Sequence, residues 1–277
     1  MRICHSASSA PNFDFAPDLG KATLIVLKPN LGYAKQHPVV TRAQLLHDVI
    51  NHLLTIAPQA KLVMIEGICC KQDFFTVMKR VGVAEWFDWQ RFNATGIATG
   101  ATLQWGERVE LWDADCCPTR AYTNTAKAFR FSEILAPAIL AEADAGISVA
   151  PLKKTYLKNA PLISGAVKNL FGLLPRSAYK ARSANSRGQL HRPDVHQVVC
   201  DVHGCLAPYF QYGIIDLHEF FESNDWKPDS GKATPMGKTV FASSLLHADL
   251  EAMSLLSEPL DHFHTLLLER FAKGANQ

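Results

Sequence analysis

Apolar runs and their spacing predict an alternation of strands and helices along the chain. Residues 22–27 (ATLIVL) and 61–65 (KLVMI) are short apolar runs that are typical of buried strands. Between them, leucine, valine and isoleucine recur at helical spacing over residues 45–54, with Thr41 as the expected N-cap. A strand, a helix and a strand with short connections predict a βαβ unit whose strands are parallel.

The rest of the chain repeats this alternation less regularly. Further strands are expected at residues 109–112, 146–150, 212–217 and 240–242. Helices are expected at residues 73–81, 131–143, 164–175, 195–206, 249–256 and 260–272. Loops are expected at residues 176–193 and 231–237 (GKATPMG). The pattern predicts an α/β fold with a mostly parallel sheet and helices on both faces. One unit over residues 1–277 is expected, and two lobes, 20–143 and 144–277, are the alternative.

Composition narrows the class of protein. The chain has 277 residues, 48% hydrophobic and 19% charged, which is an ordinary globular balance. No apolar run reaches the roughly 18–20 residues that span a bilayer, and the first residues lack the apolar segment of a secretory signal. The seven cysteines include two adjacent pairs and do not resemble a secreted disulfide framework. We therefore expect a soluble cytoplasmic protein with reduced thiols and no membrane partner.

Charge is distributed unevenly along the chain. Residues 145–193 contain nine lysines and arginines and no acidic residue, which leaves 19 cations against 26 anions elsewhere. Such a segment favours an acidic ligand nearby. The alternative is a solvated basic face.

Polar residues follow the ends of the predicted strands: Lys28, Asn30, Glu66, Lys153, Lys154 and Asp216. In open parallel sheets, ligands bind beyond the carboxyl ends of the strands, so these side chains are expected to share one site. Lysines suit a phosphate or carboxylate, while Glu66 and Asp216 could transfer a proton or bind a cation. The alternative is that the chain merely turns into water there.

The segment GAVKNLFG is a second candidate for ligand binding. If Ser164 caps a helix, the amides near Gly165 point outward and the helix dipole favours an anion. Lys168 and Asn169 would lie one turn further along, within reach of a phosphate or carboxylate. The alternative is a buried helix whose glycines allow close packing.

Taken together, several blocks resemble the domain-of-unknown-function 362 family: LKPNLG, IEG, ADAGISVAPLKKT, SGAVKNLFGLLP, IIDL, GKATPMG and ASSLLHADLEAM. The resemblance covers nearly the whole chain and implies an α/β fold. For many relatives it also implies iron–sulfur binding, through an attached ferredoxin-like module. This chain has no C-x2-C-x2-C-x3-C-P run, so it resembles a stand-alone member without that module. His191 matches a recurrent histidine of the family, which makes it a candidate for proton transfer or anion contact.

The cysteines offer a different chemistry. If their loops meet at one edge of the sheet, Cys69, Cys70, Cys116 and Cys117 could bind a metal ion or a small iron–sulfur cluster. Ordinary reduced cysteine is the alternative. His196, Cys200 and His203 fall on one face of a predicted helix, where a metal site competes with plain core packing.

Three functions follow from these candidates. The leading one is an enzyme that binds an anionic small molecule through Lys28, Lys154 and Lys168, with Glu66, His191 or Asp216 as acid or base. The second is a metal or iron–sulfur redox protein that uses the paired cysteines. The third is nucleic-acid binding through residues 176–192, although Tyr179 is the only aromatic residue in that stretch.

Overall fold

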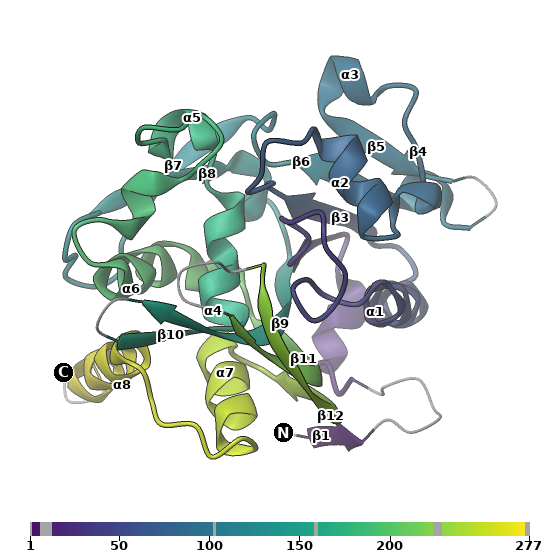
Figure 1. Cartoon of the computed structure of the whole chain (residues 1–277). Coiled ribbons are helices and arrows are strands. Elements are labelled where there is room, and N and C mark those ends of the chain that lie inside the picture. Colours follow the sequence, from purple (N-terminus) through teal and green to yellow (C-terminus); the bar gives the residue numbers. More distant parts are fainter. Residues whose placement is uncertain (1, 6–12, 102–103, 158–159, 224–228, 275–277) are drawn as a thin grey trace.

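One sheet organises the molecule. The computed structural model describes residues 2–5, 13–101, 104–157, 160–223 and 229–274. Within them, ten strands form a single mixed sheet with helices packed against it, and two further strands form a separate ribbon (Figure 1).

The centre of the sheet is parallel. Its five strands, in spatial order, are β6 (Val109–Asp113), β3 (Lys61–Glu66), β2 (Leu24–Pro29), β9 (Ala145–Leu157) and β11 (Tyr212–Ser223). Successive side chains of these strands point to opposite faces of the sheet and pack into different apolar clusters. Val26 belongs to the apolar cluster on one face, whereas Ile25 and Leu27 belong to the cluster on the other. Burial on both faces explains why these strands are almost continuously apolar in the sequence.

Antiparallel strands extend both margins of this parallel centre. Beyond β11 lie β12 (Gly231–Ala242) and β1 (Arg2–His5), and beyond β6 lie β5 (Ile97–Gly100) and β4 (Phe87–Asp88). Strand β10 (Ala160–Ser164) pairs with β9 as a hairpin. The separate ribbon consists of β7 (Thr119–Thr123) and β8 (Glu133–Pro137).

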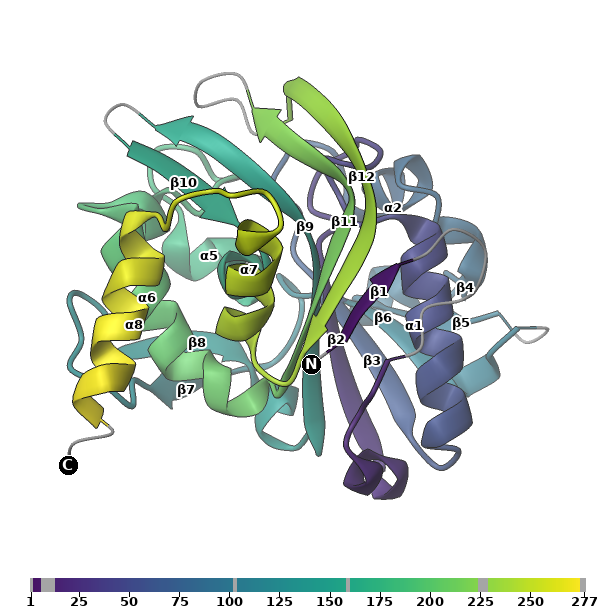
Figure 2. The same ribbon diagram turned by 90° about the horizontal axis from the view of Figure 1, so that it is seen from below.

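Helices cover both faces of the sheet (Figure 2). The cluster on one face includes residues of α1 (Ala43–Ile56) and α2 (Phe74–Arg80). The opposite cluster draws on α4 (Ala166–Asn169), α6 (Val195–Leu206), α7 (Leu245–Ser254) and α8 (His262–Gly274). Two short helices, α3 (Phe92–Thr95) and α5 (Arg176–Tyr179), complete the α-helices of the described chain. The predicted α/β class, with helices on both faces and a parallel β2–α1–β3 unit, is confirmed.

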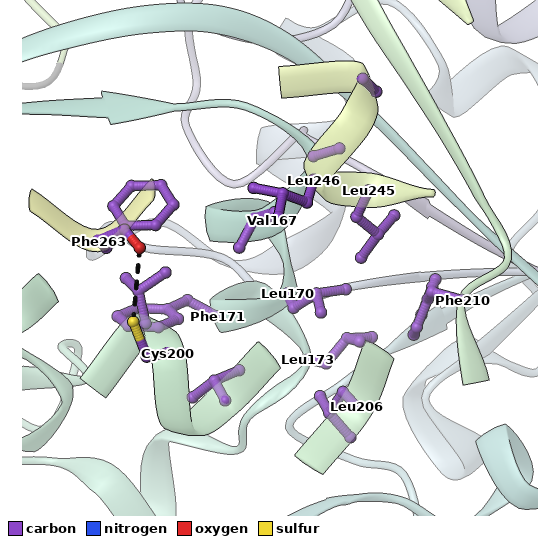
Figure 3. Close-up of a cluster of buried hydrophobic side chains, with 14 of the residues drawn as sticks. Val167, Leu170, Phe171, Leu173, Cys200, Leu206, Phe210, Leu245, Leu246 and Phe263 are labelled. Carbon is purple, nitrogen blue, oxygen red and sulfur yellow. Dashed lines mark hydrogen bonds between the residues drawn. The ribbon is translucent and has the colours of Figure 1, made fainter. Parts of the chain in front are cut away.

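The cluster around α4 holds the site described below in place. Leu170, Phe171 and Leu173, which follow α4 in a 3-10 turn (Leu170–Leu173), pack among side chains from α6, α7 and α8 (Figure 3). The Cys200 thiol donates to the carbonyl oxygen of Phe263 over 3.6 Å, which ties α6 to α8. His196 accepts from the Phe263 amide, so this face of α6 makes packing contacts with α8.

Several predicted elements were wrong. Residues 131–143 do not form one helix: they contain strand β8 and a 3-10 turn (Ala138–Ala141), because Pro137 has no amide hydrogen for a helical bond. The predicted loop 231–237 is the first half of strand β12. Thr41 does not cap α1, since its hydroxyl donates to the Val149 carbonyl, 3.0 Å away.

Two strands continue beyond their predicted ends. The run at residues 146–150 extends through Pro151 to Leu157, and the run at residues 212–217 extends to Ser223. The two extensions still pair with each other in parallel after a shift in register, and antiparallel pairing with β10 and β12 adds hydrogen bonds on their other sides. A single sheet contains strands from both predicted lobes. The boundary between the lobes, at residues 143 and 144, stays a prediction.

Candidate functional site

A cavity of about 430 Å³ opens beyond the carboxyl ends of β2 and β3. Seven of the predicted catalytic and anion-binding residues line it: Lys28, Asn30, Glu66, Lys153, Lys168, Asn169 and His191. They come from β2, β3, β9, α4 and the segment before α6, up to 163 positions apart in the sequence. Lys28, Asn30 and Glu66 lie at or just beyond the carboxyl ends of β2 and β3, where ligands of parallel sheets bind, and the other four residues reach the same cavity from other elements.

Lys28 and Glu66 form a buried ion pair at the floor of the cavity. The Lys28 Nζ donates to Glu66 Oε1 over 2.7 Å, and both side chains are at most 2% exposed. Lys28 also donates to the Pro29 carbonyl oxygen and to Asn169 Oδ1. Burial lowers the pKa of Lys28, and the Glu66 carboxylate opposes that change. All three N–H bonds of this ammonium group thus have acceptors.

Glu66 holds the backbone around it. Its carboxylate also accepts from the amides of Gly67 and Leu31, which anchors the loops after β3 and β2. A Cβ atom placed on Gly172 would lie 2.6 Å from Glu66 Oε1 and 2.7 Å from Lys28 Nζ, so only glycine allows this approach. With three donors already bound, Glu66 acts as a structural acceptor in this state, and its predicted role as acid or base stays a prediction.

Lys153 and Lys168 are the two cavity lysines that have no carboxylate within ion-pair distance among the described residues. Lys153 is buried, and its Nζ donates to the Val39 carbonyl oxygen over 2.8 Å. The Nζ of Lys168 lies 3.6 Å from the centre of the Phe171 ring. Burial lowers the pKa of Lys153 to about 8, and burial together with the charges of Lys153 and Arg187 lowers that of Lys168 to about 7.

His191 stands at the exposed side of the cavity. Its Nδ1 lies 3.3 Å from the Arg187 carbonyl oxygen, and its ring meets the Phe171 ring edge to face at 6.0 Å. Desolvation by the surrounding protein and the positive charge of Lys168 lower the pKa of His191. The imidazole is therefore neutral at physiological pH. Donation from Nδ1 to the carbonyl leaves Nε2 as the proton acceptor.

Arg187 is a cavity residue that sequence reasoning did not single out. It is buried, and its guanidinium donates to the carbonyl oxygens of Leu174, Ile68 and Gly172. It therefore joins the loop after β3 to the segment after α4. In the sequence, Arg187 is one of nine lysines and arginines in residues 145–193, and its spacing does not distinguish it from the other eight.

The basic stretch 176–192 is partly internal. Arg187 lies inside the cavity wall, and Arg176 pairs with Asp115 at 2.5 Å. These two arginines are thus held by the protein itself, which reduces the charge that the stretch could offer to a nucleic acid.

Lys154 does not join the site, contrary to the prediction. Strand β9 continues past Pro151, so consecutive side chains point to opposite faces. Lys153 and Thr155 face the cavity together with Ser164 of the paired strand β10. Lys154 instead pairs with Glu258 at 2.7 Å.

Asp216 is also absent from the cavity wall. It is fully buried, accepts from Arg42 Nε over 2.8 Å and from the Arg42 amide over 2.9 Å, and lies 3.3 Å from His37 Nδ1. The carboxylate thus fixes the start of α1. Asp216 lies within β11, which continues to Ser223, so the predicted strand end at this residue is wrong.

Gly165 fails as an anion site because the protein supplies its own anion there. Gly165, not Ser164, precedes α4, and the Asp249 carboxylate accepts from the amides of Ala166 and Val167 over 2.6 and 3.2 Å. A Cβ atom on Gly165 would lie 2.3 Å from Asp249 Oδ1. The glycine is required for this internal contact, and the predicted Ser164 cap is wrong.

The paired cysteines do not form a cluster. Among the described residues, which include Cys69, Cys70, Cys116 and Cys117, no group of three or more histidine, cysteine or acidic side chains is placed to hold a metal ion. Burial raises the pKa of the Cys116 and Cys117 thiols. Cys69 lines the cavity instead, with its sulfur 3.4 Å from Arg187 Nη1. The geometry therefore gives the metal hypothesis no support.

Comparison with known proteins places the chain in a family. The model of the domain of unknown function DUF362 matches residues 25–253. The chain belongs to the DUF362 family. This match confirms the resemblance carried by the ordered sequence blocks, and the matched DUF362 region contains every cavity residue named above.

Other comparisons add little to the family assignment. A solved structure, the lactate racemase apoprotein from Thermoanaerobacterium thermosaccharolyticum, is similar with a TM-score of 0.46 and 12% identity. The similarity covers 90% of this DUF362 chain and 52% of that protein, so the chain spans about half its length. The comparison with curated proteins found no match. None of the helices in the described residues has the length and apolar character of a membrane span.

Proposed function

We propose that this DUF362 protein is an enzyme whose cavity binds a small anionic substrate through a carboxylate or phosphate. The observation that supports it best is the presence of Lys153 and Lys168 in one cavity wall without a carboxylate partner. Lys28 and Arg187 add positive charge to the same wall, while Glu66 is the acidic residue among the lining side chains.

The energetics favour an anionic ligand. Removing a cation from water costs free energy unless an anion or hydrogen-bond acceptors replace the lost solvation. The lowered pKa values of Lys153 and Lys168 express that cost. A bound carboxylate or phosphate would supply the missing partner. The cavity volume of about 430 Å³ lies in the range of small-molecule sites, about 300–1,000 Å³.

Lys153→Met is expected to weaken the binding of inorganic phosphate or pyruvate by about ten- to hundredfold, because it removes a charged donor worth about 1.5–3 kcal/mol. Isothermal titration calorimetry with each anion measures the effect. Lys154→Met is the matched control, because the neighbouring lysine faces away from the cavity and should leave affinity unchanged. Equal losses in both variants, or no binding of either anion by the wild type, would refute the proposal.

Binding should also weaken as pH rises. The cationic forms of Lys168 and Lys153, whose pKa values are about 7 and about 8, attract the anion, and raising the pH discharges them. Affinity for acetate, a carboxylate that has no ketone carbonyl to react with an amine, should therefore fall above pH 7, by up to about tenfold per pH unit for each lysine. Titrations across this range in the wild type and in Lys153→Met test it: the variant should lose the part of the decline centred near pH 8. A flat profile in the wild type would contradict this linkage.

A further inference from the structure

The three lysines of the cavity differ in whether their amino group is free to react. Lys28 has acceptors for all three of its N–H bonds, and Lys153 donates to the Val39 carbonyl. Within the part of the chain that the structure describes, Lys168 Nζ has neither a hydrogen-bond acceptor nor an ion-pair partner. Its Nζ lies over the face of the Phe171 ring, which attracts an ammonium group but is not a conventional hydrogen-bond acceptor.

Lys168 also has a neutral fraction that can attack a carbonyl. Burial and the nearby charges of Lys153 and Arg187 lower its pKa to about 7, so the uncharged amine is well populated near neutral pH. Amines activated in this way are the usual nucleophiles of lysine-dependent covalent catalysis. The position of the amine in the cavity wall, rather than its titration alone, makes it available to a ligand.

A carboxylate can be held beside this amine. Lys153 and Thr155 project from one face of β9, and Ser164, which is paired with Lys153 across the hairpin, lies on the same face. All three line the cavity. One donor of Lys153 is bound to Val39, which leaves two N–H bonds for an anion.

We propose that Lys168 forms an imine with the carbonyl carbon of a 2-oxo acid whose carboxylate is bound by Lys153. A 2-oxo acid carries the two groups that this wall can engage, an anion and an electrophilic carbonyl carbon next to it. The inference rests on the proposed function and names the substrate class of that site.

The step balances without a further reactant. The Lys168 lone pair bonds to the carbonyl carbon, the π electrons move to the oxygen, and a proton passes from nitrogen to that oxygen. The nitrogen lone pair then forms the C=N bond as the hydroxyl leaves with a proton as water. One amine and one carbonyl become one imine and one water molecule.

His191 is placed to carry protons in these steps. His191 contacts the same Phe171 ring as Lys168, and the centres of the His191 and Phe171 rings are 6.0 Å apart. Its neutral imidazole has a lone pair on Nε2. It can accept the proton released by the amine and return it to the departing hydroxyl. We therefore assign His191 the role of proton carrier for Lys168.

Reductive trapping tests the imine directly. The full chain is incubated with pyruvate and sodium cyanoborohydride, which reduces an imine to a stable secondary amine. Intact-mass measurement and peptide mapping are expected to find one reduced pyruvate adduct, on Lys168. Lys168→Arg, which keeps the charge but not the nucleophile, should form no adduct, whereas Lys180→Arg at an exposed position should react like the wild type.

The outcomes separate this inference from the proposed function. If calorimetry shows pyruvate binding but no adduct forms on Lys168, the imine is refuted and anion binding stands. An equal adduct yield in Lys168→Arg also refutes the imine, because other lysines would then account for it. If neither pyruvate nor phosphate binds, the proposed function fails together with the inference.

Discussion

Lys28→Met is expected to lower the free energy of unfolding by about 3–5 kcal/mol, because it leaves the Glu66 carboxylate buried without its cation. The variant also removes a donor from Asn169 Oδ1. Such a loss is a large fraction of the total stability of a typical domain, about 5–15 kcal/mol. Urea denaturation followed by circular dichroism measures it through the shift of the midpoint.

A matched control separates burial from ion pairing. Lys61, at the start of neighbouring strand β3, pairs with Glu110 at 2.8 Å, but its side chain is 47% exposed. Lys61→Met should cost no more than about 1 kcal/mol, as is usual for solvent-exposed pairs. If Lys28→Met costs no more than Lys61→Met, the buried pair does not hold the floor of the cavity.

A double variant tests whether the cost comes from the unpaired charge. In Lys28→Met combined with Glu66→Gln, the side chain at position 66 carries no charge. Its single amide oxygen can accept from one of the two amides, Gly67 or Leu31, which Glu66 binds with separate oxygens. The double variant is therefore expected to be more stable than Lys28→Met alone. A double-mutant cycle gives the coupling energy between the two positions. Additive losses would show that the pair is not coupled.

The ends of the apolar runs were the sequence feature that best predicted residues of the cavity. The apolar runs before Lys28 and Glu66 are buried on both faces, so their pattern is continuous and their ends are visible. The rule that ligands bind beyond the carboxyl ends of parallel strands then brought both residues to one cavity wall. The same signal misplaced Lys154, because β9 does not end at Pro151 but continues as a hairpin.

Other features could not be predicted because their partners are distant and their local pattern is uninformative. The first half of β12 contains Gly231 and Pro235 and is mostly exposed, so it resembles a loop. Pairing with β11 makes it a strand, and an edge position tolerates the proline. The cap of α4 comes from Asp249, about 80 residues further along the chain. Only the fold brings that carboxylate to the Gly165 backbone.

The carboxylate that caps α4 belongs to a buried network that should make stability depend on pH. His264 lies between Asp261, at 2.7 Å from its Nδ1, and Asp249, at 3.5 Å from its Nε2. Burial by itself would lower the pKa of His264, but the charges of the two carboxylates and the hydrogen bond with Asp261 raise it to about 9. In the unfolded chain its pKa is near 6.5.

Because the folded state binds this proton more tightly, His264 stabilises the protein fully below about pH 6.5 and loses that contribution as the pH rises to about 9. The expected loss is about 3 kcal/mol, on the scale of 1.4 kcal/mol per pH unit. Lys153 and Lys168 act in the opposite direction: their pKa values are lowered by folding, so they make stability rise with pH above about 7. The wild-type profile alone therefore mixes opposing contributions.

Comparing variants at each pH isolates His264. The difference in unfolding free energy between the wild type and His264→Gln should shrink by about 3 kcal/mol between pH 6 and pH 9.5, since both proteins contain the same lysines. His196→Gln is the matched control: that imidazole also contacts α8, but folding lowers its pKa, so its difference from the wild type should stay constant above pH 7. A wild-type minus His264→Gln difference that stays constant over this range would mean that His264 carries no extra proton in the folded protein. The two carboxylates would then be held by their backbone amide donors, Ala166 and Val167 for Asp249 and Ile163 and His264 for Asp261.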